Sequence, residues 1–334
     1  MTRRVAIAGV AVIAALALGA CSAGELVAKE TAQSAQQAPN LDAGRVDEVL
    51  EEVALALDKA DSALDKEAFE ERITAGAART RAAQYAYAQA SGDTIPSLDL
   101  TPQNLAVTNS AQWPRAILNI RQADASQLPV VQVFVQSDAR SSYALTAWCR
   151  MLGGTSVTMP AIEQGSAFVT NDSTGFVSTP EEALTAYVDM LNAGQTSSEA
   201  FAGDEFTAQY LDTVKTLASS LEAAGTVTAN AAATSDPIAG VVLQDGSALV
   251  AANFTYTLNY SRTIAKSTMR LGGQTATMNS GDDDTVKGTA TVTYVATVLI
   301  NIPSSSQGGV SRIVGADRVI ESVAMDDSTN PDNA

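Results

Sequence analysis

The order of the predicted elements constrains the fold of this chain more than any other feature. Apolar residues from Val46 to Leu64 recur at intervals of three and four, which is the spacing of one helix face. From Leu98 onward the period falls to two, as in 129–136, where valines alternate with other residues. Helices followed by strands predict an α+β fold, with helices on one face of an antiparallel sheet.

The first half holds one long helical stretch and four strands. Helical periodicity covers 42–90, and Asp65 is placed to cap the second piece of that stretch. Ser91-Gly92-Asp93 and then Pro96 end it. The predicted strands are bounded by turn residues and cover 104–109, 115–121, 129–136 and 142–151.

The second half repeats this order of helices and then strands. Thr179 as N-cap, Pro180 at the first helical position and Glu182 at the third predict a capping box that starts a helix. A second helix is expected over 204–224, and Asp245-Gly246 is typical of a hairpin turn. The predicted strands cover 226–233, 240–243, 248–260, 263–271, 288–302 and 312–323.

The amino terminus has the features of an export signal. Arg3 and Arg4 precede sixteen uncharged residues, Val5 to Ala20. As a helix these sixteen residues span roughly 24 Å, which is short of the ~30 Å hydrocarbon core of a bilayer. The segment is therefore interpreted as the apolar region of a signal peptide rather than a permanent membrane span.

Leu18-Gly19-Ala20-Cys21 resembles the bacterial lipobox, with leucine, two small residues and cysteine at the required offsets. The resemblance implies that a diacylglyceryl group is attached to the Cys21 thiol and that a peptidase cuts before this residue. Two acyl chains anchor a protein stably, so the mature chain is expected on the outer face of the cytoplasmic membrane. The alternative is an ordinary signal peptide that happens to have a cysteine after its cleavage site.

These patterns divide the chain into five parts. The tether after Cys21 is rich in Ala, Gln, Ser and Glu, and as a coil it reaches roughly 25 Å. The expected parts are a signal peptide (1–20), the lipidated cysteine and tether (21–40), two α+β domains (41–175 and 176–325) and a disordered tail (326–334).

Charge excludes several classes of partner. The formal net charge is −17, and cleavage before Cys21 makes it more negative by removing Arg3 and Arg4. The remaining Lys and Arg residues are scattered, whereas nucleic acid binding needs clustered cations. The same scatter disfavours electrostatic adsorption to anionic lipid. The acidity is interpreted as a means of keeping a tethered protein soluble.

The chemistry of common enzymes and metal sites is missing from the sequence. There is no histidine, so the usual general base, the Ser-His and Cys-His pairs and most zinc sites are excluded. Cys149 lies in an apolar run and is interpreted as a small buried side chain. Gly281-Asp-Asp-Asp284 lacks the spacing of a calcium loop and is interpreted as a solvated turn. We therefore expect no cofactor, no metal and no enzymatic activity.

The second half also resembles the nuclear transport factor 2-like domains, through Thr179 and the segment Leu184-Thr-Ala-Tyr187. Those domains bend a sheet into a cone whose pocket is closed by helices, and they include enzymes and plain binding modules alike. The whole chain is similar to actinobacterial lipoproteins that pair a helical-then-β region with such a domain. The segments behind this similarity are 112–115, 133–135, 143–145 and 298–303.

Three functional readings follow from the sequence. The first is a non-catalytic binding module for a small apolar ligand or an envelope protein, with a pocket lined by Tyr187, Phe206, Phe254 and Tyr256. The second is an envelope scaffold, for which that pocket is filled by its own side chains. The third is a histidine-free hydrolase or isomerase, which needs two carboxylates, or an Asp and a Tyr, to converge with perturbed pKa values. Trp113 and Trp148 are interpreted as core or rim aromatics, or alternatively as a stacking platform for a ligand.

Overall fold

The computed structural model describes residues 38–281 and 283–333, and these described residues form one compact unit. Leu18, Gly19, Ala20 and Cys21 lie outside the described residues, so the expected signal peptide and lipid attachment stay predictions. Within the described ranges, no helix is both long enough and apolar enough to span a bilayer.

The long helical stretch of the first half is divided by a break at Leu64. Helix α1 runs over Ala43–Ala63, the short 3-10 helix η1 over Lys66–Phe69 and helix α2 over Ala75–Ser91. Leu64 ends α1 in a left-handed conformation with φ 48°. Asp65 then caps η1 by accepting a hydrogen bond from the Glu67 N–H, so the predicted capping role of Asp65 is confirmed.

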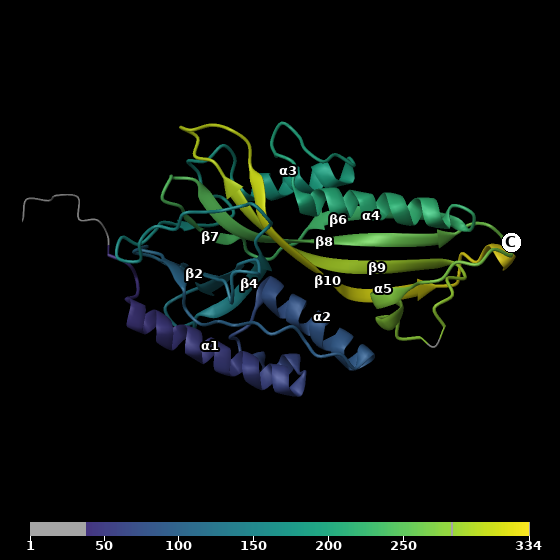
Figure 1. Cartoon of the computed structure of the whole chain (residues 1–334), viewed down its shortest axis with the longest axis horizontal. Helices are drawn as coiled ribbons and strands as arrows, with labels where there is room; N and C mark the ends of the chain where they lie inside the picture. Colours follow the sequence, from purple (N-terminus) through teal and green to yellow (C-terminus); the bar gives the residue numbers. More distant parts are fainter. Residues whose placement is uncertain (1–37, 282, 334) are drawn as a thin grey trace, which may run out of the picture. The chain divides into compact units, whose positions relative to one another are not determined.

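The four expected strands of the first half form an antiparallel meander in sequence order (Figure 1). One face packs on α1 and α2, where Ile117 and Phe134 join Val46 and Leu50 in one apolar cluster. The opposite face packs on the second sheet. The strands are β1 (Asn104–Val107), β2 (Arg115–Arg121), β3 (Val130–Gln136) and β4 (Ala144–Arg150).

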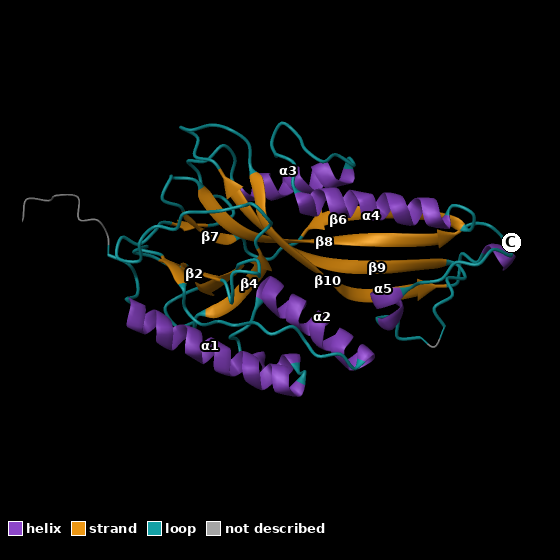
Figure 2. Cartoon of the chain, in the orientation of Figure 1, coloured by secondary structure: helices purple, strands orange, loops and turns teal. Residues whose placement is uncertain are grey.

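Two helices begin the second half, as the sequence predicts. Helix α3 covers Pro180–Asn192 and helix α4 covers Glu205–Leu221. The predicted capping box is present, because the Thr179 side chain accepts from the Glu182 N–H and the Glu182 carboxylate accepts from the Thr179 N–H. Both helices lie on one face of the larger sheet (Figure 2).

The larger sheet has the order β10-β9-β8-β7-β5, with β6 also paired to β8. Strand β8 alternates between two environments. Phe254 and Tyr256 face α3 and α4, whereas Leu249 and Ala251 face the four-stranded sheet. The strands are β5 (Phe168–Val169), β6 (Gly225–Ala233), β7 (Ala239–Val242), β8 (Ala248–Arg262), β9 (Thr289–Ile302) and β10 (Arg312–Asp326).

The α+β class is confirmed, but the strand expected over 263–271 is absent. The chain turns there instead, with Lys266 in a left-handed conformation and the Ser267 hydroxyl donating to the Ile264 carbonyl. Local side-chain bonds of this kind compete with a strand. A short helix, α5 (Gly273–Thr277), follows the turn and was not predicted.

The expected disorder of 326–334 is wrong for the residues that the structure describes. Strand β10 continues to Asp326, and a 3-10 turn, η2, covers Pro331–Asn333. The Asp332 carboxylate accepts from the buried Arg262 guanidinium at 2.8 Å and from the Lys266 N–H at 2.6 Å. These bonds hold the carboxyl-terminal segment against the end of β8.

The boundary expected between 175 and 176 does not coincide with the boundary between the sheets. Strand β5 precedes this position in the sequence, yet it pairs with β7 of the larger sheet. The two sheets also share one buried apolar cluster, to which Leu118 and Val133 contribute from one sheet and Leu249 and Leu299 from the other. The division into tandem domains therefore stays a prediction.

Candidate functional site

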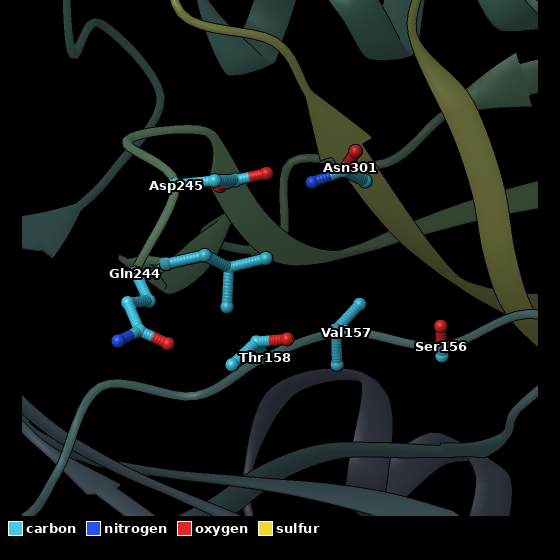
Figure 3. A pocket seen from close by; sticks show the side chains of 7 residues that line it. Ser156, Val157, Thr158, Gln244, Asp245 and Asn301 are labelled. Carbon is cyan, nitrogen blue, oxygen red and sulfur yellow. The ribbon is translucent and has the colours of Figure 1, made fainter.

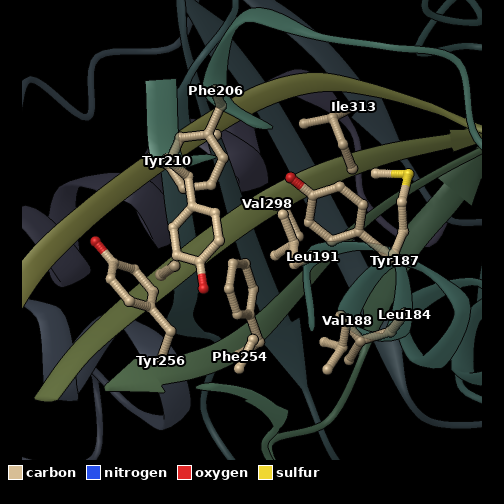
Figure 4. Close-up of a cluster of buried hydrophobic side chains, with 14 of the residues drawn as sticks. Leu184, Tyr187, Val188, Leu191, Phe206, Tyr210, Phe254, Tyr256, Val298 and Ile313 are labelled. Atoms are coloured by element: carbon tan, nitrogen blue, oxygen red, sulfur yellow. The ribbon is translucent and has the colours of Figure 1, made fainter. Parts of the chain in front are cut away.

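The four residues predicted to line a ligand pocket do come together, beneath α3 and α4 (Figure 4). Tyr187 lies on α3, Phe206 on α4, and Phe254 and Tyr256 on β8. The ring of Phe254 lies 5.9 Å from that of Tyr187 and 6.5 Å from that of Phe206, both edge-on. These distances are typical of stabilising aromatic pairs.

The aromatic cluster is packed rather than hollow. The four side chains are between 0% and 7% exposed, and the ring of Tyr256 stacks on that of Tyr294 at 4.5 Å. Four pockets in the described part of the chain, two of which are described below, have none of these residues in their lining. Their rings fill the space that a small apolar ligand would take.

An Asp and a Tyr approach each other at one edge of this cluster. The Thr207 hydroxyl donates to the Asp204 carboxylate at 2.7 Å, so the Tyr187 hydroxyl donates to the Thr207 oxygen at 2.8 Å. Burial raises the pKa of both Asp204 and Tyr187. However, the Asp204 carboxylate also accepts the Thr207 N–H as the N-cap of α4. This carboxylate is occupied in starting a helix and faces no described pocket.

A small polar pocket of about 350 Å³ lies between the 156–158 segment and the β7–β8 turn (Figure 3). Asp245 is its one carboxylate, and the hydrogen bond from the Ser247 hydroxyl lowers the pKa of Asp245. Asn301 donates to the Ser247 oxygen at 2.8 Å. Asp245 and Asn301 are thus linked through the Ser247 hydroxyl, and a single carboxylate gives no acid–base pair.

The largest of the described pockets, about 1070 Å³, runs along β10 and is called the β10 groove below. One wall is the exposed side of α2 with the loop 93–98, and the other is β10 itself over 317–320. Leu128, Val130 and Trp148 close it from the four-stranded sheet, and Gln274 and Met278 close it near α5. Its lining is mixed, with apolar side chains between polar ones, as in many binding grooves.

A buried ion pair fixes the α2 wall of the groove. Arg81 is 1% exposed, and its guanidinium donates to both carboxylate oxygens of Asp61 on α1. The same guanidinium donates to the carbonyl of Pro96 at 2.8 Å, and the Tyr85 hydroxyl donates to Asp61 at 2.6 Å. Burial and the Asp61 carboxylate together raise the pKa of Tyr85. Arg81 therefore joins α1, α2 and the groove loop.

The acidic residues of β10 beside the groove are already paired. The Asp317 carboxylate accepts from the Arg150 guanidinium at 2.6 Å and from the Arg150 N–H at 3.0 Å. Glu321 accepts two bonds of 2.8 Å from Arg79 on α2. These carboxylates raise the pKa of Arg150 and of Arg79. Charged side chains on an edge strand normally repel another strand that approaches it. Because Asp317 and Glu321 are each neutralised by an arginine, this repulsion is weaker on β10.

Other segments cover two edges of the four-stranded sheet. At β1, the Ser166 N–H donates to the Val107 carbonyl. At β4, the Leu145 N–H donates to the Arg72 carbonyl and the Leu145 carbonyl accepts from the Thr74 N–H. Covering an edge in this way prevents unwanted strand pairing.

The outer edges of β6 and β10 differ. The Asn192 side chain accepts from the Ala231 N–H at 2.7 Å and donates to the Ala231 carbonyl at 2.9 Å. It therefore occupies the backbone groups that Ala231 presents on the outer edge of β6. On β10, the Val314 carbonyl accepts from the Leu152 N–H. Met151 and Gly315 form an antiparallel bridge at the same place. Beyond this bridge, over 317–325, β10 is the edge strand of the larger sheet, and no other described strand pairs with its outer side. This open edge borders the β10 groove.

Three further sequence interpretations concern cysteine, the acidic loop and tryptophan. Cys149 is fully buried, which raises the pKa of its thiol well above the ordinary value, so the interpretation as a buried apolar side chain is confirmed. Asp283 accepts from Thr285, and within 38–281 and 283–333 no cluster suits a metal ion. Trp148 is buried at the groove, whereas Trp113 is 38% exposed.

Comparison with known proteins adds no relative. No protein-family model matches the chain, and neither the curated proteins nor the solved structures searched contain a match.

Proposed function

We propose that this chain is a lipid-anchored extracytoplasmic protein that binds an extended segment of another envelope protein, without catalysis, in the β10 groove. The anchor is the diacylglyceryl group expected on Cys21, and its support is the run Leu18-Gly19-Ala20-Cys21 after an apolar segment. The binding role has a separate support, which is the open edge of β10.

The observation that carries the binding role is a groove of about 1070 Å³ beside an unpaired strand edge. Exposed N–H and C=O groups along an edge bind an extended peptide by adding a strand, and the adjoining pockets take alternate side chains. The groove offers apolar contacts from Leu128, Trp148 and Val319 for those side chains. The outer edge of β6, whose Ala231 backbone groups are bonded to Asn192, borders no comparable groove among the described pockets.

Two other readings have less support. A small apolar ligand between Tyr187 and Phe254 would have to displace packed rings.

We keep the likeness of the second half to the nuclear transport factor 2-like cone as part of the proposal, with α3 and α4 over the sheet. A scaffold is the second candidate, because the filled aromatic cluster and the apolar cluster shared by the sheets suit a rigid spacer.

Site-specific photo-crosslinking tests the binding role. A benzophenone amino acid at Leu128, on the rim of the groove, is expected to give a discrete adduct in the native host. Ile264, which is exposed to a similar extent but lies outside the groove lining, is the matched control position. No adduct is expected there.

Two Val→Lys substitutions test whether the crosslink at Leu128 depends on the open edge of β10. Val319→Lys puts a charged side chain on the open edge, which opposes strand addition, and should abolish the Leu128 adduct. Val177→Lys changes an exposed valine outside the groove lining and should leave the adduct intact. An adduct that persists in Val319→Lys, or one that forms equally from position 264, refutes binding in the groove.

The anchor is tested separately. Mass spectrometry of the protein from its native membrane should show a mature chain that begins at Cys21 and carries acyl groups. Cys21→Ala should leave an uncleaved or released protein. Unchanged processing and membrane retention in that variant would contradict the anchor and leave the groove untouched.

A further inference from the structure

An exposed tryptophan and an uncompensated arginine stack on each other at the start of β2. The Arg115 guanidinium lies 4.3 Å from the centre of the Trp113 ring, and the Trp113 indole N–H donates to the Gln136 side chain at 3.1 Å. The Trp113 side chain is 38% exposed. The pair thus presents an indole ring backed by a positive charge on a strongly acidic protein.

Arg115, like the partly buried Arg318, has no carboxylate partner in the described part of the chain. Among the described residues, no carboxylate lies within 4.0 Å of it, and its buried Nε has no hydrogen-bond acceptor. By contrast, Arg72, Arg81 and Arg121 each pair with a carboxylate. The buried Nε does not reach the outside of the chain, but the two Nη groups are not among the buried atoms and are suited to a phosphate oxygen.

A second unsatisfied group lies in the same row of the sheet. Arg115 is paired with Gln136 across β2 and β3, and Tyr143 comes just before Ala144, which is paired with Val135. The Tyr143 hydroxyl is buried and has no partner in the described structure. Burial raises its pKa to about 12, while Arg115 acts in the opposite direction. Two buried polar atoms in this row of the sheet are therefore left unpaired.

The described chain begins beside this pair. The Asn40 N–H donates to the Thr108 carbonyl at 2.7 Å, and the Asn40 side chain donates to the Ser110 carbonyl at 2.8 Å. Ser110 is three residues before Trp113. The segment from Cys21 to Ala38 can span at most about 60 Å. If Cys21 is in the bilayer, this end of the folded part is attached nearest to it.

We infer that Trp113 and Arg115 rest on the lipid surface, with the indole in the headgroup region and the guanidinium on lipid phosphates. This inference rests on the proposed anchor. The net charge opposes adsorption from solution, so the contact forms only because the tether holds the protein there. Trp is enriched at membrane interfaces because its ring is amphipathic, and Arg pairs well with phosphate.

This contact orients the β10 groove away from the bilayer. Strand β3 begins at Val130, which lines the groove, and ends at Gln136, which binds Trp113. The two residues are six positions apart, or about 20 Å at the rise of a strand. In Figure 1, β2 and β7 lie toward one end of this unit, and α5 lies toward the end marked C. A partner thus has access to the groove while Trp113 touches lipid.

Fluorescence quenching by brominated lipid tests this inference. The full lipidated protein is reconstituted into phosphatidylcholine–phosphatidylglycerol vesicles with bromine on the upper acyl carbons. Emission of Trp113 should be quenched, and Trp113→Phe, which leaves only the buried Trp148, should show no quenching. Arg115→Gln should lower the equilibrium constant for the docked orientation about five-fold, the effect expected for one cation near an anionic surface. Arg312→Gln, at an exposed site distant in sequence, is the control.

The outcomes separate the anchor from the contact. Protein that floats with the vesicles while Trp113 emission is unquenched refutes the contact and leaves the anchor standing. Quenching that is equal in wild type and Arg115→Gln refutes the role of the guanidinium. Protein that does not float refutes the anchor, and the contact that rests on it falls as well.

Discussion

Replacing Asp61 by alanine removes the carboxylate that neutralises the buried guanidinium of Arg81. Arg81 is 1% exposed, so its charge depends on protein groups rather than on water for its solvation. The Tyr85 hydroxyl loses its acceptor in the same change. Breaking a buried ion pair by removing one partner costs about 3–5 kcal/mol, because an uncompensated charge is left in the interior. We expect Asp61→Ala to lower the free energy of unfolding by this amount.

Urea denaturation followed by circular dichroism measures the change in the free energy of unfolding. The mutant and the wild type are compared with the same slope m of that free energy against urea concentration. The pair formed by Arg72 and Glu52 is the matched control, because its 2.6 Å separation is also short while Glu52 is 58% exposed. Glu52→Ala should cost at most about 1 kcal/mol. The double variant Asp61→Leu with Arg81→Met removes both charges and should recover much of the loss.

If Asp61→Ala loses less than about 1 kcal/mol, the argument that the buried charge of Arg81 needs the Asp61 carboxylate is refuted. Such a small loss would also mean that the ion pair of Arg81 and Asp61 does not hold α2 against α1. The α2 wall of the β10 groove would then need another explanation.

Three further predictions concern the core and its ionisable groups. Phe254→Ala should cost about 3–5 kcal/mol in urea unfolding, because it opens a cavity among packed rings, and a neutral result would indicate a loose cluster. Burial raises the pKa of Asp204, so the native state binds its proton more tightly than the unfolded state, and ionisation destabilises the fold as pH rises through that window. Asp204→Asn should therefore gain stability relative to wild type as pH rises above about 4, the ordinary pKa of an aspartate, and a parallel pH profile would contradict this. The Cys149 thiol should react with a thiol reagent only on unfolding, since it is buried with a raised pKa, and fast reaction in the native state would show otherwise.

Local patterns in the sequence were enough to predict most helices and strands. The capping box at Thr179 and Glu182 and the alternation in β3 depend on neighbours in sequence, and both are present. The turn at Lys266 and the clamp of Asp332 on Arg262 were missed. Both depend on contacts between residues far apart in the chain, or on a left-handed backbone that no neighbouring residue signals.

The candidate site was predicted only in part. Tyr187, Phe206, Phe254 and Tyr256 were expected to meet and they do, because each lies on the apolar side of its own element. Whether they enclose a space or fill it depends on how tightly the helices approach, which periodicity does not report. The β10 groove combines segments from α2, the four-stranded sheet, α5 and β10. The feature that marks this groove as a binding site is a strand edge without a partner, and such an edge can be recognised only once the pairing of all strands is known.

Hydrogen–deuterium exchange on β10 tests strand addition most directly. The amides of 317–321 are compared between protein in native membrane vesicles and protein purified away from them, with the Ala231 amide, which Asn192 already binds, as an internal reference. Slower exchange over 317–321 in the native membrane, with no change at Ala231, is the expected result. Equal exchange of 317–321 in both preparations would contradict a partner strand on the open edge of β10.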